Sequence, residues 1–565
     1  MAAALTLLAV AVVYCALEQL SFRMTAPGVV CPPGLFVPLV GSIVDMVRDP
    51  YGYWERQRKL SPAGLSKFFL LGKTVFFTTD TDISRRVLMN NGPDSLQMVR
   101  AQSLQQALQR AGGGARRWPT GGPGPRMCPG AAWNRRFRLH PASVAGPARA
   151  PCIRAPAPDA PSPTPFPQAV HPSGKWILGP TNLAFQSGPE HKALRKSFLS
   201  LFTTKALGVY VAAQDRVVRL HIAKWLADPA LAAPDSFDEM RDRIRDMNQE
   251  TSQDVFVGPY LAANLRSEFG EHYRNMTDGF LSLPLPVPGT AVWRGMASRR
   301  AVIRILTDCA AAAKRRLAAG DFTPECLLDF WVEHLAEETA ACAAEGRPAP
   351  KHASDHAIAD TIMDFLFASQ DASTASLTWL AALMCDHPDV AAKVREETRR
   401  VFPKVMDPSG ADIDGDALYQ LTYTRQVAKE ALRWRPAAPM IPQVAAVDFP
   451  LADGVVAPRG SLVIPSLMAP VWSGQGFPNA EKFDPDRMSK ERAEDVTHAK
   501  HFLTFGCGPH SCVGQTYAIN HLVAFAARLA ATVDLSRKRT PDSDDFLYLP
   551  TVYPKNCLLH LEKAA

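Results

Sequence analysis

Apolar residues recur at helical spacing over most of the chain, with charged residues on the opposite faces. This pattern predicts long helices over residues 206–227, 236–255, 297–319, 355–385 and 388–401. Stretches with strand character are short, and they cover residues 67–78, 443–449, 455–464 and 556–562. Many helices with small sheets indicate a mainly α fold built as a single large domain, and not alternating βαβ units.

The amino-terminal end differs from the rest of the chain. Residues 2–17 are uncharged and mostly apolar, and we expect residues 1–22 to form a membrane anchor, although a span usually needs about 20 apolar residues. The alternative is a cleaved signal peptide, but no basic region precedes the apolar run. Arg23 follows that run and favours a cytosolic body. The proline-rich residues 23–50 predict a stiff hinge. We expect residues 51–565 to form the catalytic domain.

Residues 100–170 interrupt this domain with a different composition. They hold 13 of the 48 prolines, ten arginines and a single acidic residue, and apolar periodicity is absent. Such a segment cannot bury enough apolar surface to offset chain entropy, so we expect a disordered insertion. Its bias toward Ala, Gly, Pro and Arg favours a retained intervening sequence over an arginine-rich functional loop.

Charge and cysteine content exclude two classes of protein. The net charge of +7 arises from residues 100–170, and the nearly neutral remainder gives no indication of a nucleic-acid partner. The 11 cysteines are odd in number and show no CxxC spacing. They therefore do not suggest the disulfide framework of a secreted protein.

The segment FLTFGCGPHSCVGQ (residues 502–515) carries the richest motif. The pattern F-x-x-G-x-[RH]-x-C-x-G is matched by Phe505, Gly508, His510, Cys512 and Gly514. Glycines let the backbone approach a sulfur ligand closely, and backbone N–H groups then donate to the thiolate. A helix that starts near Gly514 places its N-terminus beside the sulfur. We therefore predict Cys512 as the axial ligand of a haem iron, with Phe505 packed on the loop and His510 at a haem propionate.

Two alternatives to Cys512 as the iron ligand remain open. One is an ordinary Gly/Cys-rich turn before a helix, but a match at five positions argues against chance. The other is ligation by Cys507, which lacks the x-Gly spacing to a helix start. We expect Cys507 to have a packing role.

Two shorter motifs precede the cysteine loop. Glu430 and Arg433 form E-x-x-R, in which the two residues share a helix face. Residues 483–487 fit F-x-P-x-R, and Arg487 is expected to join the pair in a structural charge network. Alone, such pairs are usually solvated surface contacts. In this order, however, the three motifs resemble the cytochrome P450 superfamily over nearly the whole chain, which implies a triangular, mainly helical fold that holds haem b.

The resemblance extends to a second haem contact. Residues 191–195 (HKALR) are similar to the W-x-x-x-R of the family's C helix. Arg195 is then expected to bind a haem propionate. His191 replaces the usual tryptophan, and its role as a cofactor-binding residue is a prediction.

Residues 365–374 (FLFASQDAST) resemble the oxygen-binding groove of the family's long I helix. Asp371 matches the acidic residue of that groove, whereas the usual alcohol is replaced by Ala372. Ser373 or Thr374 would then position the water that carries protons. The alternative is that Asp371 lies on a solvated helix face, but its apolar flanks favour burial, and a buried carboxylate needs a reason.

Three stretches look most like the sterol 22-desaturases of fungi, plants and algae: residues 365–373, 505–517 and 546–559. The resemblance implies that O2 and electrons from NADPH, passed through a cytochrome reductase, remove two hydrogens to form a C-22/C-23 double bond in a sterol side chain. It also implies the endoplasmic reticulum membrane, with the catalytic domain cytosolic. The candidate substrate-pocket residues, for which ordinary core packing is the alternative, are Phe367, Ala368, Met440, Thr551 and Val552.

Other functions are compatible with the same motifs. A sterol hydroxylase or a 14α-demethylase is the first alternative, although 14α-demethylases usually show histidine and threonine where this chain has Asp371 and Ala372. A haem protein without oxidative turnover, or a haem-thiolate isomerase that needs no reductase, is the second.

Overall fold

The computed structural model describes residues 2–90 with gaps at 33–40, 43–44, 46–48, 61–62 and 71, and residues 172–565 with gaps at 281, 283–284, 321, 408–411 and 550. Both stretches fall within the unit formed by Met1–Pro93 and Thr164–Ala565. The insertion predicted over residues 100–170 lies outside the described residues.

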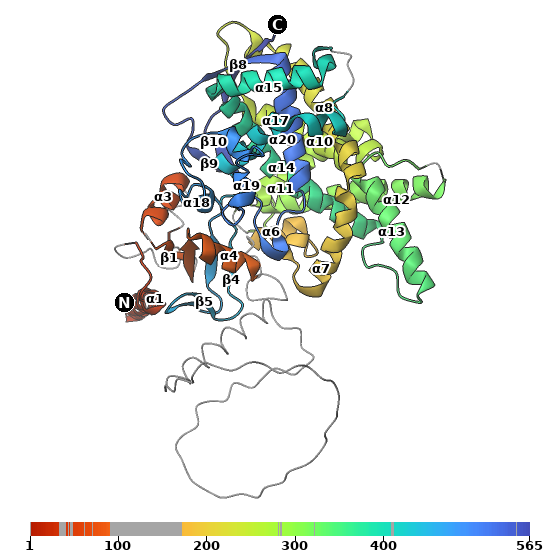
Figure 1. The fold of residues 1–565 in the computed structure, drawn as a ribbon. Helices are drawn as coiled ribbons and strands as arrows, with labels where there is room; N and C mark the ends of the chain where they lie inside the picture. The colour runs from red at the N-terminus through yellow and green to blue at the C-terminus, as the bar shows by residue number, and fades with distance from the viewer. Residues whose placement is uncertain are drawn as a thin grey trace, which may run out of the picture. The chain divides into compact units, whose positions relative to one another are not determined.

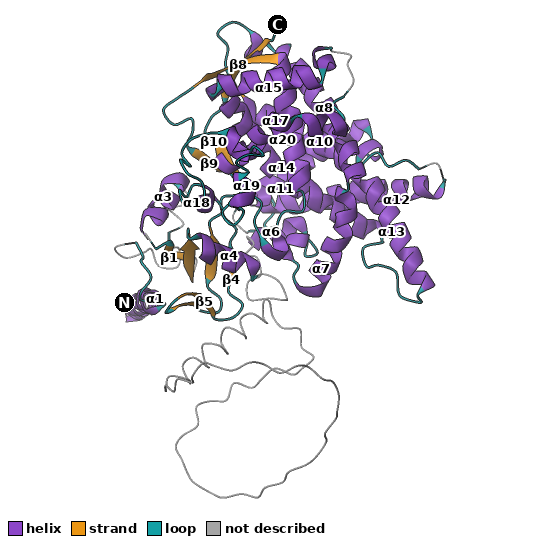
Figure 2. Cartoon of the chain, viewed as in Figure 1, coloured by secondary structure: helices purple, strands orange, loops and turns teal. Residues whose placement is uncertain are grey.

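Helices make up most of the described chain (Figures 1 and 2). The amino-terminal ones are α1 (Ala2–Met24), α3 (Pro50–Leu60) and α4 (Thr81–Met89). The later ones are α6 (Pro172–Leu178), α7 (Gly188–Ser197), α8 (Thr204–Leu226), α9 (Pro229–Ala232), α10 (Met240–Phe256), α11 (Arg266–Phe280), α12 (Ala291–Ala318), α13 (Leu327–Ala344), α14 (Asp355–Asp386), α15 (Pro388–Val401), α16 (Gly415–Gln420), α17 (Thr422–Trp434), α18 (Met468–Val471), α19 (Glu494–Thr497) and α20 (Gln515–Thr532).

The five helices predicted from apolar spacing correspond to α8, α10, α12, α14 and α15. Helix α12 begins six residues before the predicted start, because the Thr290 side chain accepts a hydrogen bond from the backbone N–H of Trp293 and caps the first turn there. The spacing of apolar residues alone does not reveal such a cap. The mainly helical fold expected from the sequence is confirmed.

The strands form small sheets. The largest has the order β1-β2-β7-β4, with β2 and β7 parallel and the other neighbours antiparallel. Its strands are β1 (Leu65–Leu70), β2 (Lys73–Thr78), β7 (Leu462–Pro465) and β4 (Gln443–Val444). The other sheets are β3 (Asp238–Glu239) with β11 (Leu558–Lys563) and β8 (Val533–Lys538), β9 (Phe546–Leu549) with β10 (Thr551–Pro554), and β5 (Phe449–Ala452) with β6 (Val455–Ala457).

Helix α14 runs through the middle of the helical part and joins two apolar clusters (Figure 1). Its first half packs with α8, α12 and α13, and its second half packs with α15, α17 and α20. Between the halves, residues 367–376 (FASQDASTAS) carry one aromatic and otherwise small or polar side chains. Ala368 is exposed although the helix around it is mostly buried. The middle of α14 is therefore the part of the core that large apolar side chains leave open.

The end of α1 is fixed to the sheet by a buried lysine. Phe22 is buried, and its ring centroid lies 6.0 Å from that of Phe69 in β1. Lys67 is 1% exposed, and its Nζ donates to the carbonyls of Thr25 at 2.5 Å and Ala26 at 3.0 Å. A cation at this position satisfies acceptors that a helix end leaves unpaired.

Among the described residues, no helix combines the length and the apolar character that a membrane span requires. The membrane anchor predicted over residues 1–22 is therefore not supported. The last two turns of α1 include Glu18, Gln19 and Arg23, where a span would need apolar side chains.

Candidate functional site

The loop before α20 presents Cys512. Gly506 and Gly508 have φ angles of +68° and +77°, which favour glycine, and a Cβ on Gly508 would lie 2.6 Å from the carbonyl oxygen of Leu88. The backbone N–H of Cys512 donates to the carbonyl of Phe505 over 2.9 Å, and the Phe505 ring packs on the core. The loop therefore needs glycine for its conformation and for its close contact with the end of α4.

Two groups beside the Cys512 thiol favour its ionised form. The residue is exposed, and α20 begins three residues later at Gln515. Desolvation by the surrounding protein raises the pKa of the thiol, whereas the backbone N–H of Gly514 and the charge of Arg195 lower it. These two groups would stabilise the thiolate form that binds a metal.

Cys507, the competing ligand, lies in an apolar cluster with buried Leu88, Leu467 and Leu503. Burial raises the pKa of its thiol. This setting fits the packing role predicted from the sequence.

Donor groups from α7 meet the cysteine loop. The His191 and His510 rings are stacked, with centroids 4.1 Å apart. Arg195 donates to the hydroxyl of Ser511 over 3.0 Å and also to its carbonyl. His191 is 2% exposed, and its Nε2 has no hydrogen-bond partner in the part of the chain that the structure describes. Burial and then Arg195 lower its pKa. The structure thus brings the sequence-predicted residues His191, Arg195 and His510 together beside Cys512.

The groove in α14 holds the predicted acid. Asp371 is 5% exposed, and burial raises its pKa to about 6. Thr374 donates to the carbonyl of Gln370 over 2.7 Å and accepts from Nδ2 of Asn248 over 3.1 Å, so α10 engages its hydroxyl. Ser373 is also buried, at 8% exposed. Of the two hydroxyls predicted to position water, that of Thr374 already has protein partners.

The pocket candidates occupy different settings. Phe367 contacts Phe280 of α11, with ring centroids 5.0 Å apart and the rings tilted by 55°, and it adjoins the exposed Ala368. Met440 is partly buried against the cluster on β1 and β2. Val552 is 1% exposed and packs in the core with Trp379 and Phe546.

The fifth candidate, Thr551, is engaged with α14, since its hydroxyl donates to the carbonyl of Asp371 over 3.0 Å. The structure therefore places Phe367 and Ala368 in the middle of α14, partly buried and exposed respectively, and Val552 in ordinary core packing.

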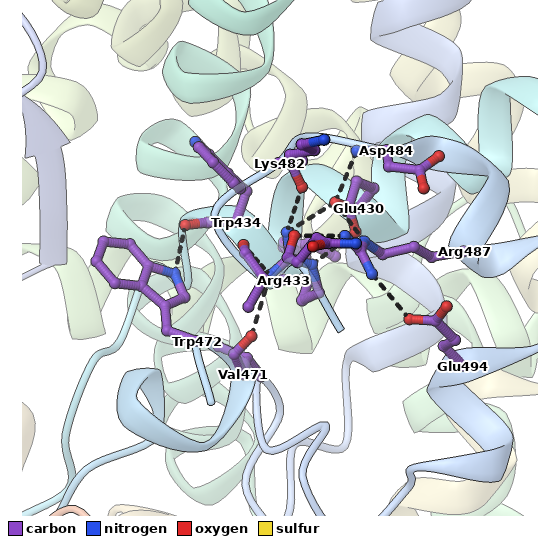
Figure 3. A network of polar contacts seen from close by, with 12 residues as sticks. Glu430, Arg433, Trp434, Val471, Trp472, Lys482, Asp484, Arg487 and Glu494 are labelled. Carbon is purple, nitrogen blue, oxygen red and sulfur yellow. Dashed lines mark hydrogen bonds and ion pairs between the residues drawn. The ribbon is translucent and has the colours of Figure 1, made fainter. Parts of the chain in front are cut away.

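Glu430, Arg433 and Arg487 form a fully buried charge network (Figure 3). Arg433 donates to both carboxylate oxygens of Glu430, over 2.7 and 2.8 Å. Arg487 lies 3.5 Å from the same carboxylate and donates to Glu494 over 3.1 Å. Burial raises the pKa of Glu430 although Arg433 and the backbone N–H of Asp484 oppose that shift. The network ties α17 to the chain that leads into the cysteine loop.

Three residues near the site carried no sequence signal. Arg245 of α10 lies 3.8 Å from the Asp371 carboxylate, and the Tyr553 hydroxyl donates to the Asp371 carbonyl over 3.1 Å. Gln443 is fully buried, and its amide atoms have no partner among the described residues. It lies two residues after Ile441, whose Cδ1 would be 3.8 Å from a Cβ added at Gly506 of the cysteine loop.

These features fit a haem. Cys512 is exposed, and the middle of α14 carries small side chains. The donors on His191, Arg195 and His510 suit carboxylates such as haem propionates, and the buried, unpartnered Nε2 of His191 needs an acceptor of this kind. Cys512 would hold the iron and the other three residues the propionates.

Comparisons with known proteins identify the family. The family model described as Cytochrome P450 matches residues 175–551. Cytochrome P450 710A4 of Arabidopsis thaliana is 34% identical over 96% of this chain and 92% of the relative. The C-22 sterol desaturase erg5 of Aspergillus fumigatus is 34% identical over 67% of this chain and 74% of the relative. The structure of retinoic acid bound cyanobacterial CYP120A1 shares the fold, with a TM-score of 0.68 at 19% identity over 95% of this chain and 100% of that one. The chain belongs to the cytochrome P450 family.

Proposed function

We propose that this cytochrome P450 introduces the C-22/C-23 double bond into a sterol side chain. The observation that carries the proposal is the similarity to a fungal C-22 sterol desaturase over 67% of the chain. Membership of the family implies haem, O2 and electrons from a reductase. We further propose haem b as the cofactor, NADPH as the electron source and a cytochrome reductase as the partner.

The stoichiometry defines what the protein must supply. Reduction of one O2 to two waters takes four electrons and four protons. The sterol provides two of each as two hydrogens, and NADPH provides two electrons. The protein must therefore deliver two protons from solvent to the oxygen and keep the sterol carbons in place.

Residues of this chain can perform these tasks. When bound, haem supplies the oxygen chemistry, and a thiolate ligand favours cleavage of the O–O bond. Asp371 holds a carboxyl whose pKa of about 6 makes both protonation states accessible near neutral pH. Ser373 is the remaining candidate for holding the water that carries the proton. Phe367 and Ala368 would orient the sterol side chain, because removal of two hydrogens needs tight placement.

Product analysis tests the proposal. The purified chain, a reductase and NADPH are incubated with a sterol that has a saturated side chain, and the product is expected to be two hydrogens lighter. A hydroxysterol as the sole product would replace desaturation by hydroxylation. Absence of O2 consumption would reject both oxidative functions.

A matched pair of cysteine variants tests the ligand in the same assay. Cys512→Ser is expected to abolish the thiolate signature in the reduced-CO difference spectrum and product formation. Cys507→Ser removes a thiol five residues away and is expected to preserve both.

The domain boundaries are also part of the proposal. We propose that residues 51–565 form the catalytic domain, with residues 23–50 as a hinge and residues 100–170 as an insertion derived from a retained intervening sequence. A reduced-CO difference spectrum of the chain with and without residues 100–170 tests this, because a dispensable insertion predicts an unchanged or stronger thiolate signal after deletion. A mature transcript that contains the segment would contradict its origin as a retained sequence.

We propose that the enzyme works on the cytosolic side of the endoplasmic reticulum membrane. A sterol is an apolar substrate, and the relatives of this chain include C-22 sterol desaturases. Fractionation of cells that express the chain tests this proposal, and recovery away from the endoplasmic reticulum would contradict it.

A further inference from the structure

The carbonyl of Asp371 receives two hydroxyl groups from β10. Thr551 Oγ1 donates to it over 3.0 Å and Tyr553 Oη over 3.1 Å. These two residues lie two positions apart on the strand, so both side chains project from the same face. A helical carbonyl normally accepts a single N–H from four residues ahead. The two extra donors fix the turn of α14 that carries the acid.

The Asp371 carboxylate itself is held loosely. Its Oδ1 lies 3.8 Å from Nη2 of Arg245, which is longer than a hydrogen bond. Both Oδ2 of Asp371 and Nη2 of Arg245 are buried, and neither has a hydrogen-bond partner among the described residues. A carboxyl group with one distant cation and a free oxygen can turn without first breaking a strong contact.

Charged and titratable groups face this carboxyl from each side. Burial has the largest effect and raises the pKa of Asp371 to about 6, whereas Arg245 of α10 and the Tyr553 hydroxyl of β10 lower it and Asp278 of α11 raises it. Tyr273 of α11 is fully buried nearby, and the Asp371 charge contributes to the raised pKa of its phenol. Arg245 and Tyr553 are thus the two neighbours that favour the ionised form.

We propose that Arg245 and Tyr553 are positioning residues for proton delivery by Asp371. This inference rests on the proposed function, because Asp371 donates protons only if oxygen is reduced at this site. The carboxyl gives up its proton toward the oxygen and is left as a carboxylate. Arg245 stabilises that carboxylate until a proton from solvent restores it, while the Tyr553 hydroxyl holds the turn of α14 that carries the acid.

Strand β10 also connects Asp371 to Thr551, a candidate residue of the substrate pocket. Tyr553 and Thr551 belong to one short strand, and Trp379 Nε1 donates to the carbonyl of Val552 between them over 2.9 Å. Strand β10 is therefore attached to α14 at two places, eight residues apart in the helix. A sterol that presses on Thr551 would act on the same hydrogen bonds that hold Asp371.

The test compares Tyr553→Phe with the wild-type enzyme. Three quantities are measured: product formed per NADPH consumed, the solvent isotope effect on turnover, and the pH dependence of turnover. We expect turnover to fall on the order of 10-fold, less product per NADPH and a larger solvent isotope effect. The ionisation in the pH profile should move to higher pH, because a group that lowers the pKa of Asp371 is lost.

Tyr210→Phe is the matched control. Tyr210 is also buried, and its hydroxyl donates to the carbonyl of Leu201 over 2.9 Å, away from Asp371. It loses the same kind of hydrogen bond and is expected to keep the wild-type isotope effect and pH profile. Arg245→Gln should shift the pH profile in the same direction as Tyr553→Phe, and Arg245→Lys should return it to the wild-type position. These two variants keep the test decisive if the tyrosine variant does not fold.

The outcomes separate this inference from the proposed function. If wild-type enzyme forms no C-22 double bond but still reduces O2, the proposed substrate chemistry fails, and the isotope effect and pH profile of NADPH oxidation still test the positioning role. If wild-type enzyme desaturates sterol and neither Tyr553→Phe nor Arg245→Gln changes the isotope effect or the pH profile, the inference is overturned.

Discussion

Substitution of Arg433 is expected to destabilise the protein strongly, because Arg433 makes five hydrogen bonds from a fully buried position. Two of them reach the Glu430 carboxylate. The other three reach the carbonyls of Val471, Ala480 and Lys482, over 3.0 to 3.1 Å. One side chain therefore fixes α17 to three points on the chain that precedes the cysteine loop.

The expected loss in the free energy of unfolding follows from these five hydrogen bonds. Arg433→Lys keeps the charge, but a single ammonium group has three donors and loses at least two of the five bonds. A buried hydrogen bond to a charged group contributes about 1.5–3 kcal/mol, so the loss is roughly 3–6 kcal/mol. Arg433→Ala removes the main partner of the buried Glu430 carboxylate and leaves only Arg487, 3.5 Å away, as a charged neighbour. Loss of one partner from a buried ion pair costs about 3–5 kcal/mol, and three carbonyls also lose a donor. Since domains are stable by about 5–15 kcal/mol, we expect the lysine variant to fold and the alanine variant to fail.

Urea unfolding followed by circular dichroism checks this expectation. Arg433→Lys should lower the midpoint clearly, whereas the control Arg492→Lys should change it little, because Arg492 is 40% exposed in its ion pairs. The double variant Glu430→Leu with Arg433→Met removes both buried charges and should lose less stability than the two single variants added together. A wild-type midpoint for Arg433→Lys, or strict additivity in the double variant, would refute the reasoning.

Three further expectations concern haem binding and pH. His191→Phe keeps an aromatic ring against His510 but removes the buried Nε2, so transfer of haem to apomyoglobin should be faster than in wild type. His191→Trp restores an N–H and should slow this transfer again. Burial raises the pKa of Asp364 from 3.8 to about 8, so the folded state binds this proton more tightly than the unfolded state does. Stability should therefore fall as pH rises from about 4 to about 8, and Asp364→Asn should reduce that slope in thermal unfolding. Gly508→Ala places a Cβ 2.6 Å from a backbone carbonyl at a positive φ and should reduce haem content, whereas Gly474→Ala meets nothing within 4 Å and should not.

Local patterns in the sequence were sufficient for much of the fold. Helices α14 and α15 begin and end at or within one residue of the limits set by apolar spacing, because each has a strong boundary signal: Ser354 caps α14 and Pro388 starts α15. The same reasoning predicts Cys512 as the ligand, because its glycines and the following helix are adjacent in sequence. Residues 1–22 were a harder case, since composition suggested an anchor that the described helices do not support.

Contacts between distant segments could not be predicted in this way. The stack of His191 on His510 joins residues more than 300 positions apart, and Tyr553 reaches Asp371 across 182 positions. Nothing in the spacing of either segment indicates its partner, because the pairing depends on how α7 and β10 pack on the core.

The middle of α14 shows how sequence and structure together select the residue that holds the water. From the sequence, Ser373 and Thr374 were equivalent candidates for holding water, because both follow Asp371 by a few residues. The structure separates them, since Asn248 of α10 donates to Thr374 and the Thr374 hydroxyl is already bonded to Gln370. Ser373→Ala should therefore affect oxygen chemistry, measured as product per NADPH. Thr374→Ala should mainly lower stability, because Asn248 Nδ2 keeps its bond to the Gln370 carbonyl but loses the one to Thr374. The opposite result would mean that the contact between α10 and α14 opens during turnover, and that Thr374 holds the water.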